Sequence, residues 1–104
     1  MDKTLRFSLL YDYYGELLTP KQREAFSQHH LEDLSLAEIA ECSDCSPQSV
    51  HDLIRRTEKL LEDYEKCLGL VARAEQARVL YERIKPCLPD REQAEDLEKM
   101  LQLF

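Results

Sequence analysis

Residues 35–61 read SLAEIAECSDCSPQSVHDLIRRTEKLL, and this stretch decides the fold of the chain. Ser35, with Glu38 three residues later, forms a capping box, in which each side chain accepts a hydrogen bond from the other residue's backbone N–H. Ser46 is placed to cap a second helix, and Pro47 occupies the first helical position, where the missing N–H costs nothing. The stretch therefore predicts two short helices joined by a tight turn, the helix-turn-helix arrangement.

The turn is expected to span residues 41–45. Such turns need a residue with positive φ, which glycine adopts most easily, and Asp44 is one of the few other residue types that tolerate it. The motif is expected to have a small internal core made of Ile39, Ala40, Cys45, Val50 and Ile54. Two helices this short cannot enclose a core alone, so other helices must complete it.

Two amphipathic segments precede the motif. Residues 4–18 predict a helix whose tyrosines belong to the core rather than to a stacking platform for bases. Thr19 and Pro20 begin the next helix, which is expected to run to about His30. His29 and His30 are expected at its frayed end, facing solvent or stabilised by the helix dipole. The inward stripe of the first helix consists of Leu5, Leu9, Leu10, Tyr13, Tyr14, Leu17 and Leu18.

Apolar residues continue past the motif in a coiled-coil-like rhythm of four and three residues. This predicts that the second motif helix is extended until Gly69 interrupts it. A further helix follows until Pro86 stops it, and Asp90 caps a last helix, so the C-terminal part is expected to be an antiparallel hairpin. The rhythm occupies positions 50, 54, 57, 61, 64, 68 and 71, and the last helix is marked by Ala94, Leu97, Leu101 and Phe104.

The fold class is therefore all-α, with a helix-turn-helix unit, an extended recognition helix and a C-terminal helical hairpin. We expect a helix-turn-helix part at residues 1–68 and a hairpin at residues 69–104, both within a single compact domain. The apolar rhythm continues after Thr57 and offers more apolar side chains than one helix-turn-helix motif can bury. This favours a homodimer whose interface involves the extended second motif helix and the hairpin. Folding of the hairpin back onto a monomer is the competing interpretation.

Composition excludes several classes of protein. The 104 residues include only two glycines, and no glycine-rich phosphate loop, serine nucleophile motif or paired catalytic carboxylates occur, so an enzyme is not expected. No apolar run reaches the roughly 20 residues of a membrane span, and the N-terminus has no signal-peptide pattern. We therefore expect a cytoplasmic protein without membrane insertion and without a cofactor.

The four cysteines do not suggest a disulfide framework, because a chain of this class is expected in a reducing compartment. Cys42 and Cys45 have the spacing of half a zinc site, but no second pair completes it, so no metal is expected. Cys45 is expected to pack as a small apolar residue and Cys42 to be partly exposed at a helix end.

The charge distribution argues against tight binding of nucleic acid, which depends on neutralisation of phosphates by Lys and Arg. The chain carries a formal charge of −7, and its three successive thirds carry −2, −4 and −1. The basic residues of the recognition helix, Arg55, Arg56 and Lys59, alternate with Asp52 and Glu58.

Three segments of the chain resemble one known family. LLTPKQ at 17–22, LEDLSLAEIAE at 31–41 and SPQSVHDLIRRTEKLLEDYEKCL at 46–68 are similar to the YlxM-type helix-turn-helix proteins, small bacterial proteins typically encoded beside the genes of the signal recognition particle. The match covers about two-thirds of the chain. The same block is similar to region 4 of sigma factors, whose second motif helix reads DNA in the major groove.

The resemblance implies an all-α fold, dimerisation and a regulatory role in the signal recognition particle pathway. It leaves two partners open, duplex DNA and a component of the particle such as its GTPase. If DNA is bound, the resemblance assigns base contacts to Gln48, Ser49, His51, Asp52 and Arg55, and phosphate contacts to Arg56 and Lys59. Alternatively, these side chains are only solvated and the fold serves protein contacts.

Overall fold

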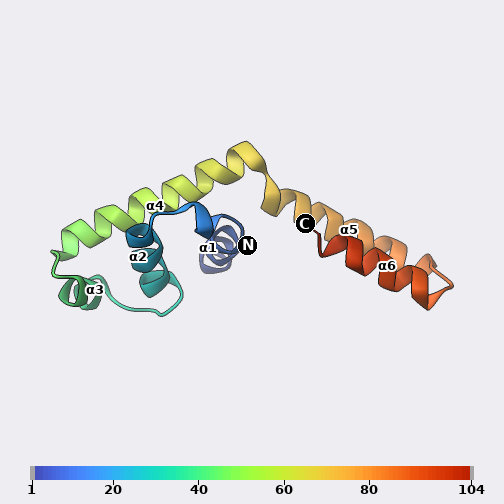
Figure 1. Ribbon diagram of the computed structural model, residues 1–104, viewed down its shortest axis with the longest axis horizontal. Helices are drawn as coiled ribbons and strands as arrows, with labels where there is room; N and C mark the ends of the chain where they lie inside the picture. Colours follow the sequence, from blue (N-terminus) through green and yellow to red (C-terminus); the bar gives the residue numbers. More distant parts are fainter. Residues whose placement is uncertain (1, 104) are drawn as a thin grey trace. The chain divides into compact units, whose positions relative to one another are not determined.

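The computed structural model describes residues 2–103, which form six α-helices and two short 3-10 turns without a strand (Figure 1). The predicted all-α helix-turn-helix fold is confirmed. The elements are α1 (Lys3–Tyr14), η1 (Gly15–Leu17), α2 (Pro20–His30), α3 (Leu36–Ser43), α4 (Pro47–Leu68), α5 (Leu70–Ile84), η2 (Lys85–Cys87) and α6 (Arg91–Leu101).

The chain divides into two compact units, the first ending at Leu68 and the second beginning at Gly69. Gly69 has a left-handed φ of 63°, which ends α4 and lets α5 begin one residue later. The boundary falls where the apolar rhythm of the sequence is interrupted. That the two parts form one compact domain stays a prediction.

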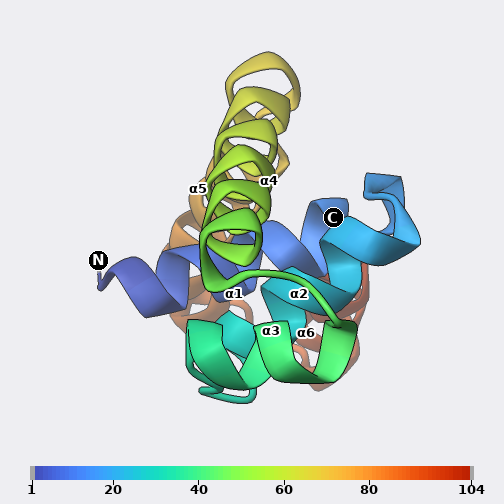
Figure 2. The ribbon, with the colours of Figure 1, turned by 90° about the vertical axis from the view of Figure 1, so that its left-hand side faces the viewer.

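In the first unit, α1, α2 and α3 pack on one side of the long helix α4 (Figures 1 and 2). The helix caps predicted at Thr19 and Ser35 both form. The Thr19 hydroxyl accepts the N–H of Gln22 at 3.2 Å, and the Ser35 hydroxyl accepts the N–H of Glu38 at 3.1 Å. Because the backbone N–H of each cap residue also donates to the side-chain oxygen of the residue three positions ahead, both helices begin at the predicted residues.

The turn of the motif is shorter than predicted. Residues 41–43 belong to α3, which continues to Ser43. The Ser43 hydroxyl donates to the Ile39 carbonyl at 2.7 Å within its last turn. Asp44 then adopts the predicted left-handed conformation, with φ 56°. The N–H of Cys45 returns to the Ala40 carbonyl at 3.1 Å, which ends the helix.

The core of the motif forms largely as expected. Ile39, Ala40, Val50 and Ile54 are buried together, and Cys45 packs against them partly exposed. The fifth buried member is Ala25 of α2, which the sequence did not identify. It shows how a neighbouring helix closes a core that two short helices leave open.

The prediction of which α1 side chains face inward was only partly right. Leu10, Tyr14 and Leu18 are buried, but Leu5 and Leu17 are 52% and 56% exposed. For Leu17 the reason is the 3-10 turn η1, which takes its side chain out of the α-helical register. Leu5 lies within α1, whose buried residues are Phe7, Leu10 and Tyr14, so its side chain is off the buried face. The buried side chains of this part of the core are Phe7, Leu10, Tyr14, Leu18, Ala25 and Phe26.

Two polar contacts fasten α1 to α4. The Arg6 guanidinium donates to both carboxylate oxygens of Glu62, at 2.8 and 2.7 Å, and these hydrogen bonds lower the pKa of the Glu62 carboxyl. The hydroxyl of Tyr14, a fully buried residue, donates to Glu65 at 2.5 Å. Tyr14 is thus a core residue, as predicted, and the structure adds that its hydroxyl is paired with Glu65.

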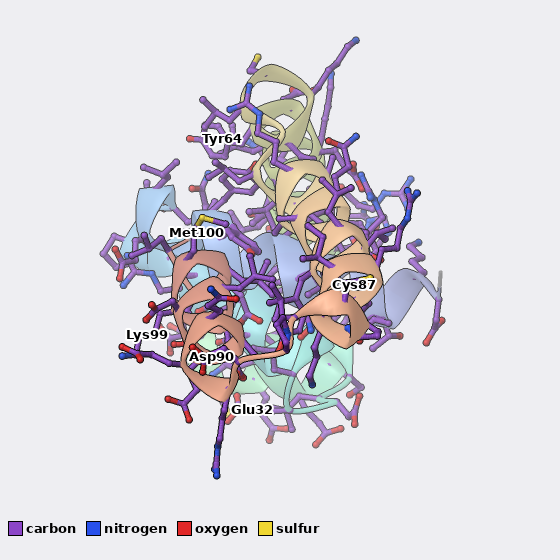
Figure 3. The ribbon with its side chains drawn as sticks, turned by 90° about the vertical axis from the view of Figure 1, so that its right-hand side faces the viewer. Glu32, Tyr64, Cys87, Asp90, Lys99 and Met100 are labelled. Atoms are coloured by element: carbon purple, nitrogen blue, oxygen red, sulfur yellow. The ribbon has the colours of Figure 1, made fainter. Side chains whose placement is uncertain are left out.

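The second unit is the predicted antiparallel hairpin of α5 and α6, with Asp90 at its turn (Figure 3). The Asp90 carboxylate accepts the N–H of Glu92 at 3.0 Å, which confirms the predicted cap. Val71 and Tyr81 are the buried residues of α5, and α6 has none. The predicted contact of Phe104 lies outside the described residues. Among residues 2–103, no helix is both long and apolar enough to cross a membrane.

Candidate nucleic-acid interface

The outward face of α4 carries all seven side chains for which the sequence suggested contacts with nucleic acid. The helix periodicity places them opposite the buried stripe of Val50, Ile54 and Thr57. Every one of them is exposed, whereas the inward stripe is closed to solvent. They are Gln48, Ser49, His51, Asp52, Arg55, Arg56 and Lys59.

Ser46 fixes the start of this face. Its hydroxyl accepts the N–H of Ser49 at 3.1 Å, which confirms the predicted cap of α4. The Ser46 and Ser49 hydroxyls are also hydrogen-bonded to each other at 2.9 Å. Ser49 is therefore held in the cap and is less available for a ligand than its exposure suggests.

Asp52 organises the middle of the face. Its carboxylate accepts a hydrogen bond from Gln48 Nε2 at 3.0 Å, and the Nδ1 atom of His51 lies 3.6 Å from the same oxygen. Its backbone carbonyl accepts a bond from Arg56 Nε at 3.4 Å. The negative charge of Asp52 is thus placed beside the groups that would meet an anionic ligand.

Arg55 and Lys59 differ from the other members of the face. Both are exposed, and within residues 2–103 neither forms an ion pair or a side-chain hydrogen bond. An unpaired cation on a helix face keeps its whole charge for a partner. These two side chains are therefore the most available cations of the motif.

The inner side of α4 carries a polar pair that the sequence did not reveal. Nε2 of His30 lies 2.8 Å from the Glu58 carboxylate, and both side chains are only 13% exposed. The imidazole also packs against Phe26, with ring centroids 4.4 Å apart. The prediction that His30 faces solvent was wrong, because it considered α2 alone and the wall over this residue comes from α4 and α1.

Burial lowers the pKa of His30, and the hydrogen bond that His30 donates to Glu58 opposes this shift only in part. The unfolded chain therefore binds a proton at a higher pH than the folded chain does. Consequently the free energy of unfolding should fall as the pH drops below the unfolded pKa of about 6.5.

This pH dependence can be tested with His30→Gln, which keeps an N–H donor for Glu58 but cannot titrate. Urea unfolding at a series of pH values between about 7.5 and 5.5 should show a steeper loss of stability for the original chain than for the variant. Equal slopes in the two proteins would contradict the assignment to His30.

Cys42 and Cys45 are free cysteines, and Cys45 lines a hollow together with Ser49, Asp52 and Arg56 of this face. Cys42 is exposed at the end of α3, and Cys45 is partly buried in the turn. Within residues 2–103, no three His, Cys, Asp or Glu side chains come together as a metal site.

Fold and face together define a helix-turn-helix protein whose second helix is extended. The chain belongs to the UPF0122 family, described as "Putative helix-turn-helix protein, YlxM / p13 like", whose family model matches residues 1–102. The resemblance stated from the sequence is thereby confirmed.

Three bacterial relatives illustrate the match. A UPF0122 protein of Geobacillus kaustophilus is 51% identical over 82% of this chain and 77% of its own length. One from Oceanobacillus iheyensis is 45% identical over 99% of this chain and 98% of its own. A third, from Halalkalibacterium halodurans, is 43% identical over 98% and 94%.

Proposed function

We propose that this protein is a regulatory protein of the signal recognition particle pathway that binds duplex DNA through the outward face of α4. The observation that carries the DNA-binding part is the pair of exposed, unpaired cations Arg55 and Lys59 on the helix that enters the major groove in this motif. The link with the signal recognition particle rests on the resemblance of the sequence to the YlxM-type proteins.

The proposed binding is weak at physiological salt. Residues 35–68 carry four basic and eight acidic side chains, so the field around α4 is negative. Each phosphate contact contributes through the release of counterions, and few such contacts are available. A specific site of sub-nanomolar affinity would contradict this expectation.

Two substitutions separate base contacts from phosphate contacts. Arg55→Ala is expected to cost about 1–3 kcal/mol of binding free energy and to relax sequence preference, since an arginine at a base edge discriminates between bases. Lys59→Ala should weaken binding to all sequences alike and reduce the slope of log K against log salt by about 0.9. Selection of duplexes from a random pool followed by anisotropy titrations measures both effects.

Lys66→Ala is the matched control, because Lys66 is an exposed lysine of the same helix outside the motif. If all three variants bind as the original chain does, the outward face of α4 is not the interface.

The second proposed function is a protein-interaction module acting on the signal recognition particle GTPase. The charge of −7 favours it, because acidic surfaces repel nucleic acid and attract basic protein surfaces. In this case the purified GTPase alone should bind the chain after nuclease treatment, and Arg55→Ala should leave that binding unchanged.

The proposal includes a homodimer through the hairpin, which is one of the two elements that the sequence predicts for the interface. Leu61 is fully buried inside the first unit, so it cannot face a second copy. The hairpin instead leaves Leu80, Ile84 and Met100 between 43% and 53% exposed. A hairpin of fewer than about 40 residues rarely forms a stable core alone, and a second copy would cover these side chains.

Leu80→Asp combined with Ile84→Asp is expected to convert the dimer into a monomer of 12.2 kDa in sedimentation equilibrium, with helicity retained. Val79→Asp is the matched control, since its exposed side chain points about 100° away from that of Leu80. A single 12.2 kDa species for the original chain at tens of micromolar would disprove the dimer.

A further inference from the structure

An open pocket of about 550 Å³ lies beside the outward face of α4. Its wall combines the start of α1, the end of α2, the loop before α3, the start of α3 and the first turns of α4. His51 and Arg55 belong both to the pocket and to the candidate interface. The pocket therefore continues the interface rather than forming a separate site.

All three histidines of the chain line this one pocket, together with Lys3 and Arg55. Histidine is the side chain that changes its charge near neutral pH. The three imidazoles come from different segments, because His29 and His30 end α2 and His51 lies in α4. Tertiary structure thus gathers groups that the sequence separates by about twenty residues.

Three carboxylates share the wall, and two of them are already engaged. Glu58 is paired with His30, and Glu38 accepts the N–H of Ser35 in the capping box. Asp33 has a left-handed φ of 58° and, within residues 2–103, no side-chain partner. With neutral imidazoles, these carboxylates and the two cations leave the pocket with a charge of −1, and protonation of His29 and His51 would change it to +1.

Lys3 is the cation that extends the interface away from α4. Its ammonium group lies 5.9 Å from the centre of the Phe7 ring, a buried aromatic residue, which restricts the flexible side chain near the pocket. Lys3 and Arg55 thus provide positive charge from two different helices on one wall.

We propose that this pocket is a pH-dependent part of the nucleic-acid interface, in which Lys3 and Arg55 hold a backbone phosphate that protonated histidines attract more strongly. The inference rests on the proposed function and adds two residues to it, Lys3 and His29. With neutral imidazoles the net negative charge of the pocket agrees with the weak binding expected above.

The hydrogen bonds of the histidines show which of their ring nitrogens are available for a proton. Nδ1 of His29 lies 3.1 Å from the Leu34 carbonyl, and because a carbonyl only accepts, Nδ1 carries the hydrogen and Nε2 is the atom that gains a proton. His30 is buried against Phe26 and Glu58, and burial lowers its pKa. His29 and His51 are therefore the histidines to test.

Binding to a labelled duplex of mixed sequence tests the charges of the wall. Lys3→Gln should weaken binding several-fold and reduce the salt slope by about 0.9. Asp33→Asn should strengthen binding several-fold, and asparagine tolerates the left-handed backbone at this position. Lys21→Gln, an exposed lysine of α2 outside this pocket, should change little. If Lys3→Gln and Asp33→Asn both match this control, the proposal fails.

The same titrations at about pH 7.5 and about pH 6.0 test the histidines. The original chain should bind at least about threefold more tightly at the lower pH, and His29→Gln combined with His51→Gln should remove most of this gain. A gain of equal size in the double variant would overturn the proposal.

Inorganic phosphate distinguishes this proposal from the proposed function. At about pH 6.0 it should shift the imidazole resonances of His29 and His51 in the original chain, and less in Lys3→Gln. Absence of duplex binding in every protein would disprove the proposed function, whereas absence of these shifts would overturn the pocket proposal by itself.

Discussion

Phe26→Ala is expected to lower the free energy of unfolding of the first unit by about 3–5 kcal/mol. Phe26 is fully buried at the centre of an aromatic cluster. Its ring stacks on Tyr11 with centroids 5.4 Å apart and meets Phe7 edge-on at 6.0 Å. The loss is large beside the roughly 5–15 kcal/mol that stabilise a domain, so a substantial unfolded fraction is expected.

Urea unfolding monitored by tyrosine fluorescence measures this effect, because four of the five tyrosines lie in residues 1–68. Leu5→Ala is the matched control on α1, since Leu5 is 52% exposed and should lose less than about 1 kcal/mol. A cost below about 1 kcal/mol for Phe26→Ala would show that the aromatic cluster is not the centre of the core.

Leu61→Ala is expected to cost about 2–5 kcal/mol. Leu61 is fully buried on the inward stripe of α4, so removal of its side chain leaves a cavity where α4 packs on the other helices of the first unit. The same urea titrations measure the loss. The range reflects how far the surrounding helices can collapse into the space.

Leu68→Ala provides the control from the same helix. Both leucines belong to the apolar rhythm of the sequence, but Leu68 is 45% exposed, and its substitution should cost less than about 1 kcal/mol. Equal losses of stability in Leu61→Ala and Leu68→Ala would mean that the apolar stripe of α4 is buried along its whole length in solution, as the sequence pattern suggested.

The sequence predicted where helices start because capping is local. Thr19, Ser35 and Ser46 each accept the N–H three residues ahead, and Asp90 accepts the N–H two residues ahead, so a short stretch of chain contains all the interacting atoms. The end of α3 was less predictable. The helix continues through residues 41–43 to the left-handed Asp44, and the end of a helix has no local signal as sharp as a capping box.

The outward face of α4 was predictable for a related reason. A helix fixes the direction of each side chain by its periodicity, so the buried positions Val50, Ile54 and Thr57 determine which residues must point outward. The contacts that those outward residues make are less predictable from the sequence. The pairing of Gln48 with Asp52 follows from their spacing, but the isolation of Arg55 depends on which carboxylates neighbouring helices bring near.

The sequence by itself determined the helices, their caps, the left-handed residue in the turn and the two faces of α4, because these depend on contacts between residues a few positions apart. Only the tertiary structure decided that His30 is buried against Glu58, that Leu61 is enclosed while Leu68 is exposed, and that the three histidines share a pocket with Lys3. Burial and charge at these positions depend on neighbouring helices, and a pattern within one helix carries no information on how far its partners extend.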